Sequence, residues 1–539
     1  MRTQESAGFG TIASRLAFLL NKTPDDTVLL VGERPARHEE AFRDYFRQCD
    51  RSVCAPRTAT QGATCCRQYG LVLWDTTSSG YARKDVHRDA MALCNFLADS
   101  GHLIAIWDNP CCPRNARRLL ADWRSGRRGK GIRLVWPGAI EKMLLGTGLS
   151  SVRVFLPMPG IDDMEELVSS QSKNIQLPGY SHPFLRAANR LGFYGAVHDG
   201  FVAIASKGTH DHTERLTVCL SEGISERRGI PSKLALDRFD LRGRSGLILF
   251  LRDLRSRTGW IAKVAVTPTI EGHIRTNALW LERLRNDPSM PREVRERIPP
   301  FLGSFEYRGT RVYVEGMIEG TIAWKIRDEK LLKRVDDHAL TFIRCLGRST
   351  RRLVTINVDS FGVLIDNDVY ASSPALRDSS RLCQPFDRIL RWLRNCMIGR
   401  NMHLVVGQGD FGYGNIIADQ ATGAIRAVID WNDARELEVP GVDWINFLIQ
   451  KERSKRGASF KDAVTRLGTG VVGALQDSRL CSYQDPCIHT AGVELAQVFS
   501  LSCIRYVLRA ARYGELSSAD KQDYAGALSW IASHLAEQD

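Results

Sequence analysis

The 539-residue sequence predicts a two-part protein, in which a doubly wound α/β domain precedes an α+β domain. Two observations lead to this prediction. Over residues 1–207, short apolar runs alternate with helical patterns, which is typical of a sheet with helices on both faces. From residue 235 onward, several strand-like runs come first and long helical patterns follow. A polar, turn-rich segment at 208–234 lies between the two parts and is predicted to be a linker.

The composition is that of an ordinary globular protein, with 43% hydrophobic and 25% charged residues. No apolar run approaches the length of a membrane helix, and the apolar patch near the start lacks a small-residue cleavage site. The 14 cysteines are scattered and form no C-x-x-C motif. This usage favours a reducing compartment, so the sequence predicts a cytoplasmic protein without a membrane span.

The chain is basic, with a formal net charge of +13 that comes largely from arginine. Its densest basic run is 114–133, RNARRLLADWRSGRRGKGIR. Such a run would suit nucleic acid, anionic lipid or a phosphorylated substrate, but it is also typical of a solvated helix face. Because no nucleic-acid motif accompanies the charge, we favour the solvated face and predict no nucleic-acid partner.

The elements of the first domain follow from alternating apolar runs and helical patterns. The predicted strands are 26–32, 69–75 and 103–107, and the predicted helices are 39–49 and 85–100. Asp75 and the pair Asp108–Asn109 come at the ends of strands, where α/β sheets bind ligands. Polar capping of the strands is the alternative explanation.

The layout of three segments resembles the late half of the class I methyltransferase fold: ADSGHLIAIWDN, PGAIEKMLLGTGLSSVRVFLPMP and GFYGAVHDGFVAIASK. Members of that family carry a Gly-rich turn after the first strand, where the backbone approaches S-adenosylmethionine. Here the turn has only Gly32, followed by Pro35 and two arginines. We therefore expect a degenerate methyltransferase-like domain over 1–207 that does not bind S-adenosylmethionine.

The elements of the second domain begin with strands. Strands joined by turns are predicted within 238–266 and at 311–317, with a helix at 274–284. The helices expected later are 331–345, 385–396 (with Pro385 in the first turn), 457–475, 493–513 and 517–536.

The most informative stretch is the Gly-rich loop 407–415, GQGDFGYGN, which lies between apolar runs at 404–406 and 416–418. A further run at 425–429 ends on Asp430. The pattern predicts a hairpin that places Asp410, Asn415 and Asp430 at one end of neighbouring strands. A carboxylate can take the proton of an acceptor hydroxyl, and Asn and Asp oxygens suit Mg²⁺, as in protein kinases. Ordinary turn residues in a Gly-rich loop are the alternative.

Two segments, GQGDFGYGNII and AVIDWNDA, resemble the H-G-D-x-x-x-x-N and I-D-W-E signatures of the aminoglycoside phosphotransferase and choline kinase family. The resemblance implies a two-lobed, protein kinase-like domain over 235–539, with a small lobe at about 235–320 and a helical lobe at about 321–539. It implies that Asp410 is the catalytic base and that Asn415 and Asp430 hold Mg²⁺. Gln408 stands where the family has a loop-shaping His, and Asp443 matches the last residue of its P-x-x-D motif.

The same resemblance assigns nucleotide contacts in the small lobe. Lys263, in the strand IAKV, would steady the nucleotide phosphates, although an edge-strand lysine facing water is the alternative. Gly243 and Gly246 would lie in the loop over the phosphates, and the backbone groups after Val314, at Glu315 and Met317, would meet the adenine.

One family feature is missing from the small lobe. Asn277 occupies the position of the helix Glu that usually holds the strand lysine. Either Asn277 is a weaker partner of Lys263, or another acid such as Glu271 replaces it.

The sequence therefore predicts an ATP- or GTP-dependent, Mg²⁺-requiring kinase that transfers phosphate to a hydroxyl of a sugar, amino alcohol or related metabolite. A pseudokinase or binding module without turnover is the alternative, motivated by Gln408 and Asn277. A bifunctional methyltransferase-kinase is the third hypothesis. Because the chain is basic, we expect a neutral or anionic acceptor rather than a polycationic aminoglycoside.

Overall fold

The computed structural model divides into two compact units, and each is described by itself. Unit 1 comprises residues 1–274 and 302–317, and unit 2 comprises 275–301 and 318–539. The structure describes residues 15–20, 22–23, 25–32, 42–43, 45–52, 68–75, 83–108, 137–158, 166–170, 198, 200–208, 212–240, 246–265, 268–377, 379–472, 494–512 and 518–534. The basic run at 114–133 and the turn at 33–37 lie outside these ranges.

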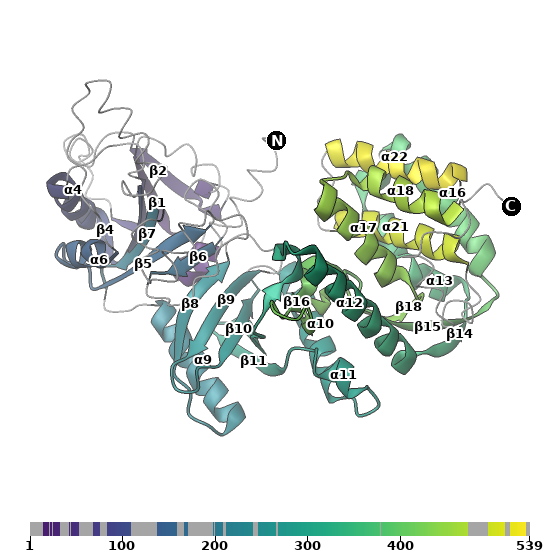
Figure 1. Ribbon diagram of the computed structural model, residues 1–539. Helices are drawn as coiled ribbons and strands as arrows, with labels where there is room; N and C mark the ends of the chain where they lie inside the picture. The colour runs from purple at the N-terminus through teal and green to yellow at the C-terminus, as the bar shows by residue number, and fades with distance from the viewer. Residues whose placement is uncertain are drawn as a thin grey trace. The chain divides into compact units, whose positions relative to one another are not determined.

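Unit 1 is built on a mixed sheet (Figure 1). Its first strands run parallel in the order β2-β1-β3-β4. β7 lies between β4 and β5 and runs antiparallel to both. The strands are β1 (Thr27–Gly32), β2 (Gln48–Ser52), β3 (Tyr69–Asp75), β4 (Leu97–Asp108), β5 (Ser151–Met158), β6 (Glu166–Ser169) and β7 (Gly200–Ser206).

Both faces of this sheet are buried, because its strands alternate apolar side chains between two cores. One core contains Val31, Trp74 and Ala105 together with side chains of α4 (Arg83–Phe96) and α6 (Pro137–Leu145). The other contains the intervening strand residues and side chains of α9 (His212–Arg228). A sheet covered on both faces is what the doubly wound pattern predicted.

Two predicted helices end earlier than the sequence pattern indicated. Residues 48–49, expected at the end of a helix, belong to β2, where Gln48 pairs with Thr27. Residues 97–100, expected to be helical, belong to β4, where Leu97 pairs with Tyr69. In both places pairing with a buried neighbouring strand overrides the local helical pattern.

The sheet continues into five further strands, because β8 pairs with β6 in antiparallel fashion. The order onward is β8-β9-β10-β12-β11, and β9 and β10 are antiparallel to their neighbours. These strands are β8 (Leu234–Asp240), β9 (Leu247–Asp253), β10 (Gly259–Val264), β11 (Phe301–Tyr307) and β12 (Thr310–Gly316). The segment expected to be a linker contains α9, whose Leu216, Leu220 and Ile224 are buried.

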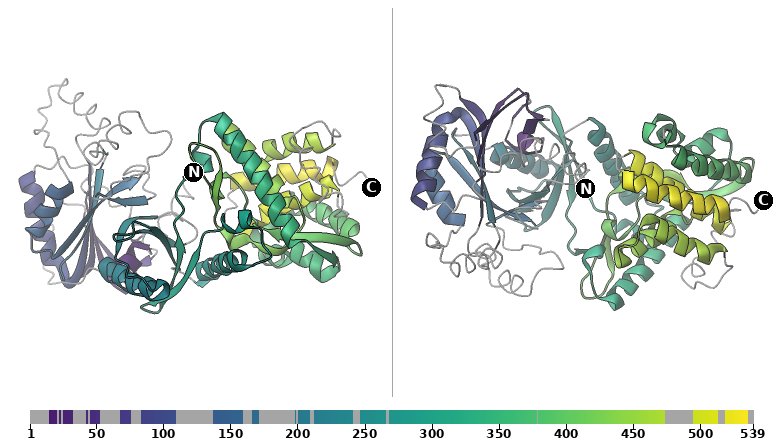
Figure 2. Two further views of the ribbon diagram at one scale, coloured as in Figure 1. Left: turned by 60° about the horizontal axis from the view of Figure 1, so that its bottom comes forward. Right: turned by 90° about the horizontal axis from the view of Figure 1, so that it is seen from above.

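Unit 2 combines two small sheets with a set of helices (Figure 2). One sheet has the order β13-β16-β17 and the other β14-β15-β18. The strands are β13 (Thr321–Ile322), β14 (Arg352–Thr355), β15 (Asn401–Gly407), β16 (Ile416–Ala418), β17 (Ile425–Val428) and β18 (Arg435–Glu438). Most of the long helices lie C-terminal to β13, as the sequence predicted.

The principal helices are α10 (Pro268–Asn286), which begins in unit 1, α11 (Arg292–Arg295), α12 (Glu329–Thr350), α13 (Val358–Leu364), α14 (Asn367–Ser372), α15 (Pro374–Arg377), α16 (Ser380–Met397), α17 (Val442–Arg456), α18 (Phe460–Val472), α21 (Leu495–Arg512) and α22 (Ser518–His534). α16 begins five residues before Pro385, so the expectation that this proline occupies the first turn was wrong. Within the described residues, no helix is both long and apolar enough to cross a membrane.

Candidate active site

The predicted hairpin is confirmed, since β16 and β17 pair in antiparallel fashion with Ile416 opposite Val428. One residue beyond this pair, the N–H of Ile429 donates to the carbonyl of Asn415 over 2.9 Å. Asp430 follows directly. Asn415 and Asp430 therefore lie at the same end of the two strands, and Asp410 lies in the loop that leads into β16.

The Gly-rich loop is anchored by aromatic side chains in the core of unit 2. Phe411 stacks on Phe342 of α12 with ring centroids 6.1 Å apart, and Trp431 packs against the same ring at 6.5 Å. Phe411 and Trp431 are at most 1% exposed. Phe411 and Trp431, which directly follow Asp410 and Asp430, thus both pack against the Phe342 ring. This packing restricts the positions of the two carboxylates.

Gln408 connects the loop to the end of the hairpin. Its side chain is fully buried, and its Nε2 donates to the carbonyls of Ile429 and Asp430 at 3.1 and 2.6 Å. Its Oε1 accepts a hydrogen bond of 2.9 Å from the N–H of Asp410. The amide can do both because it carries a donor and an acceptor, which are the two functions that a neutral His also offers.

We expect Gln408→Ala to lower the free energy of unfolding by about 2–4 kcal/mol, because the Asp410 N–H and two carbonyls lose a buried partner. Gln408→His retains one donor and one acceptor and should lose less. Urea unfolding of both variants measures the effect. Gln420→Ala, at an exposed position in the turn at the other end of the hairpin, is the control. A loss no larger in Gln408→Ala than in Gln420→Ala would contradict the bracing role.

Asp443, in the first turn of α17, binds the backbone of the same loop. Its Oδ2 accepts from the N–H of Gln408 at 2.6 Å, and its Oδ1 accepts from the N–H of Gly409 at 2.9 Å. Gly409 has a φ of +86°, and an added Cβ would lie 2.1 Å from the carbonyl oxygen of Asp433. Both the conformation and the close approach require glycine at this point of the loop.

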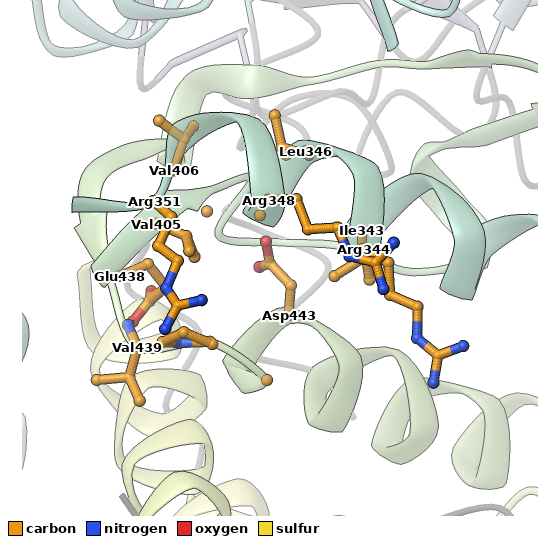
Figure 3. A pocket seen from close by; sticks show the side chains of 14 residues that line it. Ile343, Arg344, Leu346, Arg348, Arg351, Val405, Val406, Glu438, Val439 and Asp443 are labelled. Carbon is orange, nitrogen blue, oxygen red and sulfur yellow. The ribbon is translucent and has the colours of Figure 1, made fainter. Parts of the chain in front are cut away.

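The Asp443 carboxylate lines a small cavity of about 30 Å³ behind the loop (Figure 3). Arginines of α12, strand residues of β15 and the segment Glu438–Asp443 form its walls. Burial, together with the neighbouring charge of Glu438, raises the pKa of Asp443 from 3.8 to about 6. The two backbone hydrogen bonds and the charge of Arg505 act in the opposite direction.

This raised pKa predicts a pH-dependent stability. Between about pH 4 and pH 6 the folded chain binds more protons at Asp443 than the unfolded chain, so its stability falls as the pH rises through this window. A shift from 3.8 to about 6 corresponds to about 3 kcal/mol. Urea unfolding of the wild type and of Asp443→Asn should therefore give a stability difference that changes by this amount between about pH 4 and pH 7. Free energies of unfolding that change equally with pH in the two proteins would contradict the raised pKa of Asp443.

Asp410 is contacted by three side chains. The Asn415 Nδ2 donates to its carbonyl at 2.9 Å and to its Oδ2 at 3.1 Å. The Gln450 Nε2 donates to its Oδ1 at 2.9 Å, and Arg509 forms an ion pair with the same oxygen. Sequence reasoning placed Asp410 and Asn415 together but missed Gln450 and Arg509, which lie 40 and 99 residues further along the chain.

The residues predicted to hold Mg²⁺ share one end of the hairpin. Because Asn415 directs its Nδ2 toward Asp410, its Oδ1 is the atom that suits a hard cation. Asp430 has a φ of +59°, a left-handed conformation that Asp tolerates better than most residues. In the part of the chain that the structure describes, no group of three or more His, Cys, Asp or Glu residues could hold a metal ion alone.

In unit 1, Lys263 does not face water as an edge-strand lysine would. Its side chain is 7% exposed, and its Nζ lies 3.1 Å from Oε1 of Glu315 on the neighbouring strand β12. Sequence reasoning assigned Glu315 to the adenine region and looked to α10 for the acid that pairs with Lys263. The structure places this acid on β12, two strand positions from the residue directly opposite the lysine.

Three other predicted residues of the small lobe have different outcomes. Gly246 has a φ of +88°, and an added Cβ would lie 2.4 Å from the carbonyl oxygen of Val264, so strand packing alone requires this glycine. Gly243 lies outside the described residues. The Met317 N–H donates to the carbonyl of Gly259 over 3.0 Å. Contact of Met317 with adenine stays a prediction.

Asn277 has a role that the sequence did not predict. It is 3% exposed, and its Oδ1 accepts a hydrogen bond of 2.8 Å from the N–H of Trp431 within unit 2. Asn277 therefore supports the turn that follows Asp430. An acid at this position would also accept this bond, but it would place a charge in a buried site.

No family model and no curated protein matches the sequence. Similar solved structures include a thermostable mutant of aminoglycoside phosphotransferase APH(4)-Ia with AMP-PNP and hygromycin B, at 15% identity and a TM-score of 0.40. That similarity covers 58% of this chain and 98% of the other. The GDP complex of aminoglycoside 2'-phosphotransferase-IIIa is 12% identical, with a TM-score of 0.34, over 59% and 98% of the two chains.

A methyltransferase dependent on S-adenosylmethionine, from Archaeoglobus fulgidus, is 11% identical with a TM-score of 0.25, over 36% of this chain and 93% of the other. Identities of 11–15% and TM-scores of 0.25–0.40 are too low to assign an activity or a substrate. Over 58–59% of its length, this chain is similar to these two solved aminoglycoside phosphotransferase structures.

Proposed function

We propose that the chain is an ATP- or GTP-dependent phosphotransferase that moves the terminal phosphate to a hydroxyl of a small molecule, such as a sugar or amino alcohol. The observation that supports this proposal most is the arrangement around the hairpin. Asp410, Asn415 and Asp430 meet at one end of it, and Gln408 and Asp443 hold the loop there with five hydrogen bonds. These residue types are those that position a hydroxyl and a Mg²⁺-bound phosphate.

The proposed roles follow from the chemistry of each group. The Asp410 carboxylate would orient the acceptor hydroxyl and take its proton, while Asn415 keeps that carboxylate in place. The Asn415 Oδ1 and the Asp430 carboxylate would hold Mg²⁺, which commonly binds one or two protein oxygens together with nucleotide phosphates. When bound, the ion neutralises charge on the phosphates. Within unit 1, Glu315 keeps Lys263 in place as a buried cation, and contact of Lys263 with nucleotide phosphates stays a prediction from the sequence.

The second candidate is a binding module without turnover, and one observation favours it. The Asp410 oxygen that a hydroxyl would approach already receives Gln450 and Arg509. If these contacts persist with ligands bound, the positive charge of Arg509 weakens the Asp410 carboxylate as a base. The two candidates share nucleotide binding and differ in phosphate transfer.

Two further proposals concern the cellular compartment and the binding of S-adenosylmethionine. We propose a cytoplasmic location, as the scattered cysteines without a C-x-x-C motif predict. Gly32 has a packing role, because an added Cβ there would lie 2.3 Å from the carbonyl oxygen of Asp75. The one glycine left in the predicted cofactor turn thus has a structural reason, and the proposal that S-adenosylmethionine does not bind rests on the Gly-poor sequence of that turn.

The test is transfer of labelled terminal phosphate from ATP or GTP to a mixture of sugars and amino alcohols, with Mg²⁺ present and then chelated. Products are separated and identified by mass spectrometry. A Mg²⁺-dependent phosphorylated product supports the phosphotransferase. Nucleotide binding without any product from a broad set of acceptors supports the binding module instead.

A further inference from the structure

An open depression of about 470 Å³ lies beside Asp410 in unit 2. Asp410, Gln450, Arg453, Tyr506 and Arg509 are among its lining residues. Its volume falls within the range of small-molecule sites. Among the described residues, the charged side chains that line it are one carboxylate and two guanidinium groups, which gives these side chains an excess of positive charge.

The two guanidinium groups are held by one aromatic ring. The Arg509 Cζ lies 4.9 Å from the ring centroid of Tyr506, and the Arg453 Cζ lies 5.6 Å from it. Arg453 also donates a hydrogen bond to the Tyr506 hydroxyl, and this ring stacks on Phe460 at 4.6 Å. Cation–π contact with a fixed ring orients both arginines in advance of binding.

The charges of these two arginines are balanced unequally. Arg509 pairs with Asp410, and the Arg509 and Asp410 side chains are only 18% and 32% exposed. Among the residues that the structure describes, no carboxylate lies within ion-pair distance of Arg453. The depression therefore offers one arginine whose charge is offset by no carboxylate of the described residues, and one arginine that is bound to the proposed catalytic base.

An acceptor with an anionic group would pair with Arg453 and would also compete with Asp410 for Arg509. Its phosphate or carboxylate would bind Arg453 and draw Arg509 away from Asp410, which exposes the Asp410 oxygen to the hydroxyl. A cationic acceptor would be repelled by both arginines and would leave Arg509 on Asp410. Guanidinium groups are well suited to either anion, because both accept two parallel hydrogen bonds.

We propose that the acceptor of the phosphotransferase carries a phosphate or carboxylate group that Arg453 and Arg509 bind in this depression. The proposal rests on the proposed function, since it assigns the substrate class of the same site. Binding of an anionic acceptor would free Asp410 from Arg509, so that Asp410 can act as the base. In the absence of an anionic acceptor, the base stays paired.

Calorimetric titration of the full chain with four sugars tests the proposal: glucose 6-phosphate, glucuronate, glucose and glucosamine. At least one of the two anionic sugars should bind about ten-fold or more tightly than glucose, as expected for charge-assisted hydrogen bonds, and glucosamine should bind most weakly. The two anionic probes distinguish phosphate from carboxylate recognition. Arg453→Gln should remove the preference, and Arg453→Lys should keep part of it.

Arg292→Gln is the matched control, because Arg292 is 78% exposed and lies in α11, away from the residues that line the depression. It should keep the wild-type preference. Arg453→Glu should shift the preference toward glucosamine, a gain that misfolding cannot produce. The proposal is overturned if neither anionic sugar binds more tightly than glucose, or if Arg453→Gln keeps the preference.

Failure of this inference can be told apart from failure of the proposed function. Anion preference without phosphate transfer would support the binding site and count against the kinase. Phosphate transfer to neutral or cationic acceptors would support the kinase and overturn the anionic acceptor. Loss of ATP affinity in Arg453→Gln, with the sugar preference unchanged, would place Arg453 on the nucleotide phosphates and would also overturn the inference.

Discussion

Asp410→Asn is expected to lower the rate of phosphate transfer by about 10²–10⁴-fold, the usual contribution of a positioned general base. The substitution keeps the size of the side chain and its contact with Asn415 but removes the group that takes the proton. Nucleotide binding should be retained, because Asp410 is not among the proposed metal ligands. The measurement is the initial rate of labelled phosphate transfer to the acceptor that the screen identifies, at saturating nucleotide.

Asp419→Asn is the control for this comparison. Asp419 lies at the other end of the same hairpin and pairs with Arg426 over 2.6 Å. Its substitution makes the same chemical change at the far end of the hairpin without touching the site, so transfer should proceed at the wild-type rate. Equal rates in Asp410→Asn and wild type would exclude Asp410 as the base.

The second large effect is expected at Asp430. Asp430→Asn should abolish the Mg²⁺-dependent stabilisation by nucleotide, because the ion loses its only proposed carboxylate ligand. Asn also tolerates the left-handed backbone at this residue, where alanine would add strain. In the wild type, nucleotide at a hundred-fold excess over its dissociation constant should stabilise the fold by about 2.7 kcal/mol.

Thermal unfolding with ATP and with GTP, each with Mg²⁺ or chelator, measures this effect. Asp419→Asn serves again as the control and should keep the full nucleotide-dependent shift. An undiminished shift in Asp430→Asn would remove Asp430 from the metal site. That result would not bear on Asp410, whose role is tested by the transfer rates.

The hairpin and its three polar residues could be predicted from the sequence because the signals are local. Apolar runs, a turn signal and the residues at their ends all lie within thirty residues of one another. Gln450 and Arg509 have no such signal. They reach Asp410 from α17 and α21, and only the packing of these helices brings them to the loop.

Pairing across strands explains the errors elsewhere. The helical pattern before Gly101 was extended too far, because nothing in the local sequence shows that Leu97 pairs with Tyr69. The acid that pairs with Lys263 was expected on the following helix, but it is Glu315 on the adjacent strand β12. Which strands are neighbours depends on the whole fold, and short-range patterns do not encode it.

We propose that this chain binds a Mg²⁺-nucleotide through Asn415 and Asp430. Calorimetric titration of the full wild-type chain with ATP and with GTP in Mg²⁺ tests it most directly, with S-adenosylmethionine as a parallel titrant. We expect saturable binding of at least one nucleotide that weakens when Mg²⁺ is chelated, and no heat from S-adenosylmethionine. No binding of either nucleotide, or binding of S-adenosylmethionine alone, would contradict it.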